Sequence, residues 1–226
     1  MGYYTDHVLP RLMNCAGDRP RVRPLRHRVC DGLSGTVVEI GFGSGHNVPY
    51  YPREMTSVTA VEPSDVAWTL ARQRIRASGI PVLRSGLDGA SLPFPDDSYD
   101  AALSTWTLCT IPDVAVALAE LRRVLKPGGS LHFLEHGLAP DEKVRRWQRR
   151  LEPMQRRVVG GCHLTRPIVH LLDSAGFVID ALTPATSGVK AASLRTPHNL
   201  QWCGPSPPLE PGPAVFAIRG ACRAKL

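Results

Sequence analysis

Short apolar runs alternate with amphipathic segments along most of the chain. Many of the runs are rich in β-branched residues and end at an acidic residue or a glycine, which is typical of buried strands. The segments between them carry apolar residues three and four positions apart, which predicts helices. Strands that alternate with helices indicate an α/β domain with a mostly parallel sheet. The predicted strands cover residues 36–40, 56–61, 81–84, 101–106, 130–135 and 177–182, and the predicted helices cover 63–78, 112–125, 141–159 and 166–175.

Single residues refine the later part of this pattern. Pro153 is expected to interrupt the third helix, since proline lacks the backbone N–H that an interior turn needs. Thr165 is expected to cap the fourth helix, and Gly176 is expected to end it. Beyond residue 182, about thirty residues rich in proline precede a last predicted strand at 214–222. A connection this long is either a loop that covers the substrate or a disordered segment.

The composition is that of a folded protein with one domain. Of the 226 residues, 43% are hydrophobic and 21% are charged, which is enough to bury a core. No apolar run reaches the length of a membrane helix, and the first residues lack the apolar core of a secretory signal, so we expect a cytoplasmic protein. The net charge of +7 and the pI of about 9.4 permit contact with nucleic acid or anionic lipid. Arginines on a solvated face would give the same charge.

The six cysteines are scattered along the chain. None forms a C-x-x-C pair, so the sequence predicts no zinc site and no bound metal. Without an export signal, we expect reduced thiols that are mostly buried. Cys109 could act as a nucleophile, but no activating base lies next to it in sequence, which favours a buried structural thiol. The cysteines are Cys15, Cys30, Cys109, Cys162, Cys203 and Cys222.

The stretch most informative about function is residues 37–45, with the sequence VVEIGFGSG. A β-rich run reaches an acidic residue and then glycines at every second position, which predicts a tight turn after a strand. Glycine lets the backbone approach a ligand closely. A dinucleotide-binding turn has a further glycine where this chain has His46, so the pattern suits a ligand without a pyrophosphate. Glu62 ends the next strand about twenty residues after Gly41, where a carboxylate can accept hydrogen bonds from both ribose hydroxyls.

Three stretches together resemble the class I S-adenosylmethionine (SAM) methyltransferases. The glycine turn resembles their motif I, residues 88–100 resemble the signature of the methyltransferase 11 type, and the LKPGG turn at 125–129 is frequent in the superfamily. The resemblance implies a Rossmann-like class I fold, with a seven-stranded, mostly parallel sheet, helices on both faces, and SAM as cofactor. It divides the chain into an N-terminal lid or arm at 1–34, a SAM-binding domain at 35–182, and a proline-rich segment with a last antiparallel strand at 183–226.

The same resemblance implies which residues contact SAM. The side chain of Asp88 would accept a hydrogen bond from the exocyclic amine of adenine, and the backbone N–H of Gly89 would donate one to a ring nitrogen. Gly89 departs from the usual alanine, which a backbone contact tolerates. Thr105 matches a small hydroxyl residue that quinone C-methyltransferases place near the cofactor. The implied cofactor-binding residues are Glu39, Gly41, Phe42, Gly43, Gly45, Asn47, Glu62, Pro63, Asp88, Gly89 and Thr105.

The second half of the chain resembles one particular family within this superfamily. LEH at 134–136, WQ at 147–148, GC-x-L-T-R at 161–166 and STWTLCTIPD at 104–113 look like the family of alkyl thiol S-methyltransferases. This likeness implies methyl transfer to a small-molecule acceptor, with a thiol as the leading acceptor. The alternatives are a C- or O-methyltransferase acting on a quinol or lipid-like acceptor, a SAM-binding protein without activity, and an RNA-binding methyltransferase.

The acceptor decides what the site needs. A thiol already holds some thiolate at neutral pH, whereas a carbon or hydroxyl nucleophile needs a general base. His136, at the carboxyl edge of the fifth strand, is the candidate base, and His163 is the second candidate. The chain lacks the Asn/Asp-Pro-Pro-aromatic tetrad of enzymes that methylate nucleobase amines, which counts against a nucleobase N-methyltransferase. It also shows no recognisable RNA-binding module, and no nucleic-acid partner is expected. The basic helix at 141–159 allows peripheral membrane contact, and the sequence does not indicate an oligomeric state.

Overall fold

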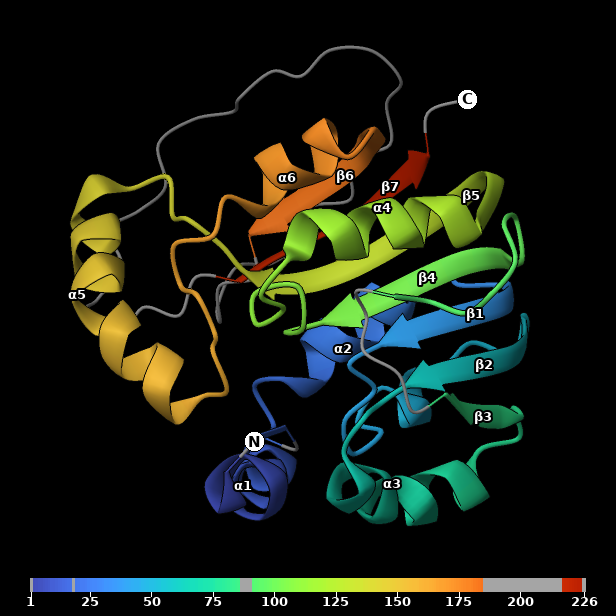
Figure 1. Ribbon diagram of the computed structural model, residues 1–226. Coiled ribbons are helices and arrows are strands. Elements are labelled where there is room, and N and C mark those ends of the chain that lie inside the picture. The colour runs from blue at the N-terminus through green and yellow to red at the C-terminus, as the bar shows by residue number, and fades with distance from the viewer. Residues whose placement is uncertain (1, 18, 86–90, 185–216, 225–226) are drawn as a thin grey trace.

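Seven strands form one sheet with helices around it (Figure 1). The strand order is β3-β2-β1-β4-β5-β7-β6. The first five strands run parallel, and β7 is antiparallel to both β5 and β6. The predicted α/β, Rossmann-like fold is confirmed. The computed structural model describes residues 2–17, 19–85, 91–184 and 217–224. The strands are β1 (Gly35–Ile40), β2 (Met55–Val61), β3 (Val82–Ser85), β4 (Tyr99–Thr105), β5 (Leu125–His136), β6 (Phe177–Pro184) and β7 (Ala217–Ala224).

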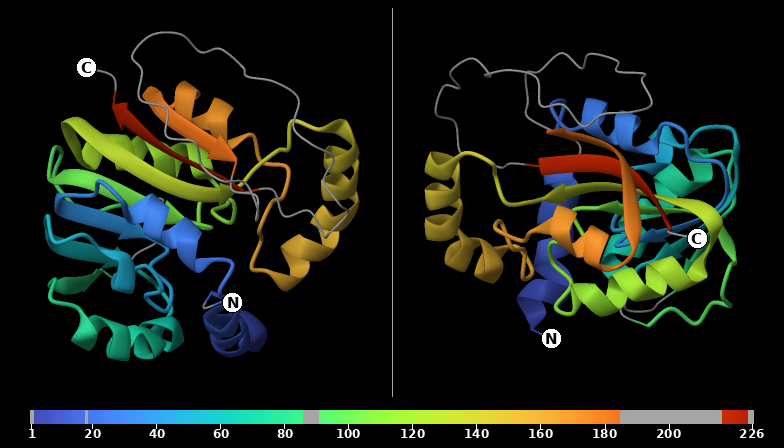
Figure 2. Two further views of the ribbon diagram at one scale, coloured as in Figure 1. Left: turned by 180° about the vertical axis from the view of Figure 1, so that it is seen from behind. Right: turned by 90° about the horizontal axis from the view of Figure 1, so that it is seen from above.

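Helices cover both faces of the sheet (Figures 1 and 2). α4 and α6 lie on one face, and α2 lies on the other, while α1 and α5 lie beyond the carboxyl ends of the parallel strands. Across the described ranges, none of the helices combines the length and the apolar character needed to span a bilayer. The helices are η1 (a π-helix, Tyr4–Val8), α1 (Leu9–Gly17), α2 (Arg23–Cys30), η2 (a 3-10 helix, Val48–Tyr50), α3 (Asp65–Ala77), α4 (Val114–Val124), α5 (Glu142–Val158) and α6 (Ile168–Ser174).

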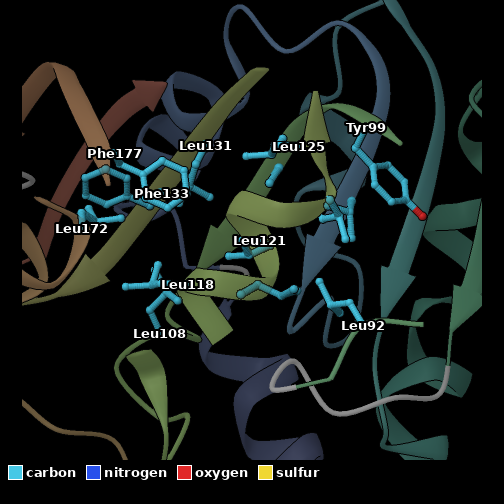
Figure 3. Packing of buried hydrophobic residues seen from close by; sticks show 14 of the residues in the cluster. Leu92, Tyr99, Leu108, Leu118, Leu121, Leu125, Leu131, Phe133, Leu172 and Phe177 are labelled. Carbon is cyan, nitrogen blue, oxygen red and sulfur yellow. The ribbon is translucent and has the colours of Figure 1, made fainter. Parts of the chain in front are cut away.

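The largest cluster of buried apolar side chains lies between the sheet and helices α4 and α6 (Figure 3). α4 buries Leu118 and Leu121 against Phe133 of β5, and it begins at Asp113, whose carboxylate accepts the Val116 N–H. A second cluster, on the α2 face, comprises Val29, Cys30, Leu33, Val37, Met55, Val58, Ala101, Leu103 and Leu134. Packing on both faces holds the carboxyl ends of β1, β4 and β5 in place, and the candidate site lies at these ends.

Two local predictions were wrong. α5 runs without a break through Pro153. Pro153 and Arg149, whose carbonyl loses its donor, are both exposed, so water can hydrate that carbonyl. Thr165 does not cap α6, because its hydroxyl and its backbone N–H both donate to the Glu152 carboxylate. Pro167 occupies the N-cap position of α6 instead, without a side-chain hydrogen bond.

Other predictions fall partly or wholly outside the described residues. Asp88 and Gly89, predicted to contact adenine, lie outside them, and so does most of the proline-rich segment at 183–213. The last predicted strand, 214–222, corresponds to β7, which pairs with both β5 and β6. This strand therefore completes the same sheet that carries the site.

The N-terminal segment is folded and lies at the carboxyl edge of the sheet. The Tyr4 hydroxyl donates to the Val158 carbonyl at the end of α5, at 2.8 Å. Arg74 of α3 donates to the Asn14 side chain at 3.1 Å and to the Ser44 carbonyl at 2.9 Å. The segment is thus tied to α5 and to the turn after β1, on the side where a ligand would enter.

Asp100 ties three strands together at the opposite, amino edge. Its carboxylate accepts the Thr36 N–H and hydroxyl, each at 2.8 Å, and the Lys126 ammonium at 2.6 Å. Lys126 and the two Thr36 donors lower the pKa of Asp100 to about 2. Because this pKa is lower in the folded chain, Asp100 stabilises the fold above its unfolded pKa of about 4, and that stabilisation is lost as the pH falls through 2.

We expect Asp100→Asn to lower the free energy of unfolding by about 1 kcal/mol at pH 7, since the pair is partly exposed. Urea unfolding at pH 7 and pH 3 measures this, and the loss should shrink at pH 3. The control is Asp65→Asn, which removes an exposed ion pair to Arg84 and should change stability by less than about 0.5 kcal/mol. Equal losses for the two variants would contradict the role of Asp100.

Candidate functional site

The chain turns sharply after β1, at the carboxyl edge of the sheet. Gly41, Gly43 and Gly45 have φ of +65°, +59° and +73°, a conformation that L side chains rarely adopt. A Cβ atom at Gly41 would lie 1.9 Å from the Thr107 hydroxyl oxygen, and one at Gly45 would lie 3.2 Å from the Ala71 Cβ. A Cβ atom at Gly43 would meet, beyond its chain neighbours, nothing closer than 3.8 Å. The turn is therefore packed against the protein at its two ends and open at Gly43.

Glu62, directly after β2, contacts this turn. Its carboxylate accepts the Gly43 N–H at 2.7 Å and the Ser64 N–H at 2.7 Å. The residue is buried, and burial raises the pKa of its carboxyl. The structure thus brings together two residues that the sequence places 19 positions apart. Both were predicted for the SAM site.

Phe42 and Pro63, which flank the hydrogen bond between Gly43 and Glu62, serve mainly to hold the surrounding backbone in place. The Phe42 side chain is buried in a cluster with Val48 and Ala60, and its ring centroid lies 5.6 Å from that of Trp68. A ligand at the turn would therefore meet the backbone of Phe42. The Pro63 carbonyl accepts a hydrogen bond from the Arg84 guanidinium at 3.2 Å, which fixes the chain after Glu62.

A buried polar network lies beneath the turn, with Asn47 at its centre. The Asn47 amide donates to the Glu39 carboxylate at 2.8 Å and to the Thr105 hydroxyl at 3.0 Å. Arg26 of α2 donates to the Asn47 carbonyl oxygen at 2.7 Å, and the Tyr51 hydroxyl donates to Glu39. Glu39 is only 1% exposed, and desolvation raises its pKa to about 7. Glu39, Asn47 and Thr105, all predicted for the cofactor site, therefore hold one another through their side chains.

A second group of side chains lies at the carboxyl end of β5. His136 Nδ1 lies 3.2 Å from the Cys162 sulfur and 3.5 Å from the Cys109 sulfur, and the two sulfurs are 3.5 Å apart. Both cysteines are buried, and His136 is half-buried. The hydrogen bond shared with Cys109 and the facing His136 ring keep the pKa of the Cys162 thiol below its ordinary range. We call these three residues the Cys–His cluster.

Glu135 positions the segment that carries Cys109. Its carboxylate accepts the Ser104 hydroxyl at 2.7 Å and the backbone N–H groups of Thr107, Leu108 and Cys109 at 3.0 to 3.1 Å. Desolvation raises the pKa of this fully buried carboxyl. Because Glu135 accepts hydrogen bonds from three consecutive backbone amides, it holds the loop after β4 against the end of β5.

The Cys–His cluster was not predicted from the sequence. The expectation of no metal site rested on the absence of C-x-x-C spacing, but these three residues come from three separate segments. Only the fold brings them to one edge. No base lies next to Cys109 in the sequence, but the fold places His136, the last residue of the neighbouring strand β5, beside it. The second candidate base, His163, is instead paired with the Glu152 carboxylate at 3.1 Å.

Comparison with known proteins identifies a methyltransferase domain in this chain. Residues 38–133 match the family model described as a methyltransferase domain. The thiol S-methyltransferase TMT1B of Rattus norvegicus is 34% identical over 148 residues, which cover 63% of this chain and 59% of that protein. A fatty-acid O-methyltransferase of Mycolicibacterium smegmatis is 30% identical over 156 residues, which cover 66% of this chain and 55% of that protein. The chain thus spans less than two thirds of the length of these relatives.

A solved structure has the same fold as the described part of the chain. It is a SAM-dependent methyltransferase from Thermotoga maritima, described as a possible histamine N-methyltransferase, and it is 23% identical with a TM-score of 0.59. The match covers 97% of this chain and 99% of that one. The sheet order, the methyltransferase model over residues 38–133 and the relatives agree, so this chain has the fold of the class I SAM-dependent methyltransferases and carries a methyltransferase domain.

Proposed function

We propose that this chain transfers a methyl group from SAM to a small-molecule acceptor, and that the acceptor is a thiol. The observation that carries the cofactor part is the hydrogen bond from the Gly43 N–H to the Glu62 carboxylate. It lies at the carboxyl ends of β1 and β2, the edge at which open α/β sheets bind ligands. The thiol part is supported by the similarity to a thiol S-methyltransferase.

The residues at this edge fit the chemistry of SAM. The ribose of the adenosyl group offers two hydroxyl donors, and the Glu62 carboxylate retains lone pairs to accept them. The open side of Gly43 lets a ligand approach the backbone. We propose positioning roles for Glu39 and Thr105, because both already hydrogen-bond to Asn47.

SAM supplies an electrophilic methyl group on a sulfonium, together with the leaving group. The chain has to align the acceptor with that methyl group and exclude water, and such positioning is worth roughly 7–11 kcal/mol of the barrier. We propose that Trp106, directly after β4, contributes to this alignment. Its φ is +54°, its N–H donates to the Leu134 carbonyl at 2.7 Å, and its ring contacts Arg26 and His136. Strained backbone of this kind concentrates at functional sites.

The surroundings of His136 favour a thiol over a carbon or hydroxyl acceptor. Nδ1 of the ring already faces two sulfurs, so only Nε2 is left to take a proton from an acceptor. A thiol needs no such base, since part of it is thiolate at neutral pH.

A lipid-like acceptor is the second candidate, and α5 is the observation that favours it. Trp147 and Met154 on this helix are 58% and 60% exposed, and arginines surround them. Exposed apolar side chains among cations suit the boundary of an anionic lipid surface. One similar protein is a fatty-acid O-methyltransferase.

Methyl transfer from labelled SAM to a panel of acceptors tests both candidates. The panel contains hydrogen sulfide, an alkyl thiol, a demethylated quinol, a fatty acid and phosphatidylethanolamine vesicles. We expect methylated thiol as the dominant product. Methylation of the fatty acid, the quinol or the vesicles without thiol product would overturn the thiol assignment. Absence of SAM binding by calorimetry would overturn the cofactor assignment.

We expect Gly43→Ala to weaken SAM binding at least about ten-fold, because the new methyl group occupies the open side of the turn. Calorimetric titration measures the dissociation constant. Gly128→Ala is a matched control: Gly128 also has positive φ and open space around its Cβ position, but it lies at the start of β5, away from the site. Backbone strain alone would weaken both variants equally, and equal weakening would remove Gly43 from the site.

A further inference from the structure

We propose that Cys109, His136 and Cys162 bind one Zn²⁺ ion and leave its fourth coordination position for the acceptor thiol. The metal site itself depends only on the Cys–His cluster. The assignment of the fourth position rests on the proposed function.

The spacing of the three donor atoms is close to that of a zinc site. Tetrahedral zinc, with Zn–S of about 2.3 Å and Zn–N of about 2.0 Å, places its ligand atoms about 3.5–3.8 Å from one another. The sulfurs and His136 Nδ1 lie 3.2 to 3.5 Å apart. Shifts of a few tenths of an ångström would therefore open the cluster around an ion. A disulfide would instead require the two sulfurs to close from 3.5 Å to about 2.05 Å.

The segments that carry the two cysteines are joined by hydrogen bonds that do not involve sulfur. The His163 N–H donates to the Cys109 carbonyl at 2.9 Å. Arg166 donates to the Leu108 carbonyl at 2.5 Å and to the Ile111 carbonyl at 2.6 Å. Glu135 holds the same loop from the other side. A supporting shell of this kind orients ligands before the metal binds, so little ordering is needed on binding.

Charge and donor chemistry select the ion. Two thiolates, a neutral imidazole and Zn²⁺ sum to zero, and a neutral complex suits a site where both cysteines are buried. Sulfur donors favour zinc over magnesium or calcium, which prefer oxygen ligands. A site with three protein ligands, two of them cysteine and one histidine, is of the open kind that keeps a position for water or substrate.

The position of the cluster suits a thiol acceptor. β4 and β5 are paired with Thr105 opposite Leu134, so His136 lies two residues past the level of the Asn47 network. Two strand spacings, about 10 Å, separate β5 from β1 and its glycine turn. On binding, the acceptor S–H would lose its proton to solvent and remain as a thiolate. Its sulfur lone pair would then form the new S–C bond while the S–CH₃ bond of the sulfonium breaks, which leaves the ion unchanged.

The metal content of the purified 226-residue chain tests the site. After equilibration with excess Zn²⁺ and desalting, we expect about one zinc per chain by mass spectrometry of the elements. Cys162→Ser should hold at least about ten-fold less. Cys15→Ser is the matched control, because Cys15 is an exposed free cysteine of α1, and it should match the wild type. Wild type without zinc, or Cys162→Ser with an undiminished zinc content, would overturn the site.

Cobalt substitution gives a readout that does not depend on a variant folding. Co²⁺ bound by two thiolates should give thiolate-to-metal charge-transfer absorption, and an excess of Zn²⁺ should remove it. A spectrum without such absorption would overturn the cysteine ligands. Addition of an alkyl thiol should shift the absorption if the thiol takes the fourth position, and an unchanged spectrum would overturn that assignment.

Calorimetric titration with SAM separates this proposal from the proposed function. Cys162→Ser should bind SAM as the wild type does, since the cluster is not part of the glycine turn. Zinc bound at one per chain without SAM binding would contradict the proposed methyltransferase function and still support the metal site. SAM binding and thiol methylation that persist in chelator-treated, zinc-free protein would overturn the role of the ion in binding the acceptor.

Discussion

Arg26→Met is expected to lower the free energy of unfolding by about 3 kcal/mol at pH 8, because it removes the cation that lowers the energy of the buried Glu39 carboxylate. Arg26 reaches Glu39 through Asn47, with hydrogen bonds of 2.7 and 2.8 Å, and its guanidinium lies 4.8 Å from the centre of the Trp106 ring. Urea unfolding of the full chain measures the loss. Arg21→Met, at an exposed arginine just before α2, is the control and should change stability by less than about 0.5 kcal/mol.

The pH dependence of the Arg26 variant identifies Glu39 as the cause. The pKa of Glu39 is raised from 4.5 to about 7, chiefly by desolvation. A carboxyl with a raised pKa favours the fold at low pH, and this contribution is lost as the pH rises from about 4.5 through 7. At pH 5 Glu39 is protonated in the folded chain, so Arg26→Met should cost less there. Adding Glu39→Gln should recover much of the loss at pH 8. A loss that is equal at both pH values and unrelieved by Glu39→Gln would contradict this explanation.

Glu62→Ala is expected to weaken SAM binding by roughly 1–3 kcal/mol, or about 5- to 150-fold, through loss of charge-assisted hydrogen bonds. The carboxylate joins the Gly43 and Ser64 amides, so the variant loses both the proposed ribose acceptor and the contact that orders the turn. Glu62→Gln keeps an acceptor oxygen of the same shape and should lose less. Calorimetric titration with SAM measures all three proteins.

Two comparisons make the Glu62 result decisive. Glu54→Ala, at an exposed glutamate just before β2, removes the same charge and should bind SAM as the wild type does. Urea unfolding of Glu62→Ala shows whether the variant is still folded under the titration conditions. An unchanged dissociation constant in folded Glu62→Ala would remove Glu62 from the cofactor site.

Much of the fold could be predicted because its strands are short, apolar and buried. The predicted strand at 36–40 is β1 (Gly35–Ile40), and the one at 56–61 is β2 (Met55–Val61). Both are flanked by turns whose residues mark the boundary locally. Thr165 and Pro153 were interpreted wrongly because their local preferences compete with tertiary contacts and with solvent, which sequence does not display.

The candidate site divides in the same way. The glycine turn and Glu62 could be predicted, since one local pattern and one spacing define them. The network around Asn47 depends on Arg26, which reaches it from α2 across 21 positions. The Cys–His cluster depends on the register of β4 and β5 and on the loop before α6. Contacts of this kind arise only when the sheet has formed, so no spacing in the sequence predicts them.

β7 lies between β5 and β6 in the sheet, although it is the last strand to be synthesised. This determines when β5 gains its second neighbour. Among the described strands β6 pairs with β7 alone, and β7 pairs with β5 from Ser130 to His136, with Ala217 opposite His136. At roughly 5–20 residues per second, a ribosome needs several seconds to proceed from β5 to β7. Until then β5 is an edge strand with open hydrogen-bonding groups, the kind of surface that invites pairing with other chains. The nascent protein is therefore most exposed to misassembly in that interval, and His136 moves from an edge to the interior of the sheet only when β7 arrives.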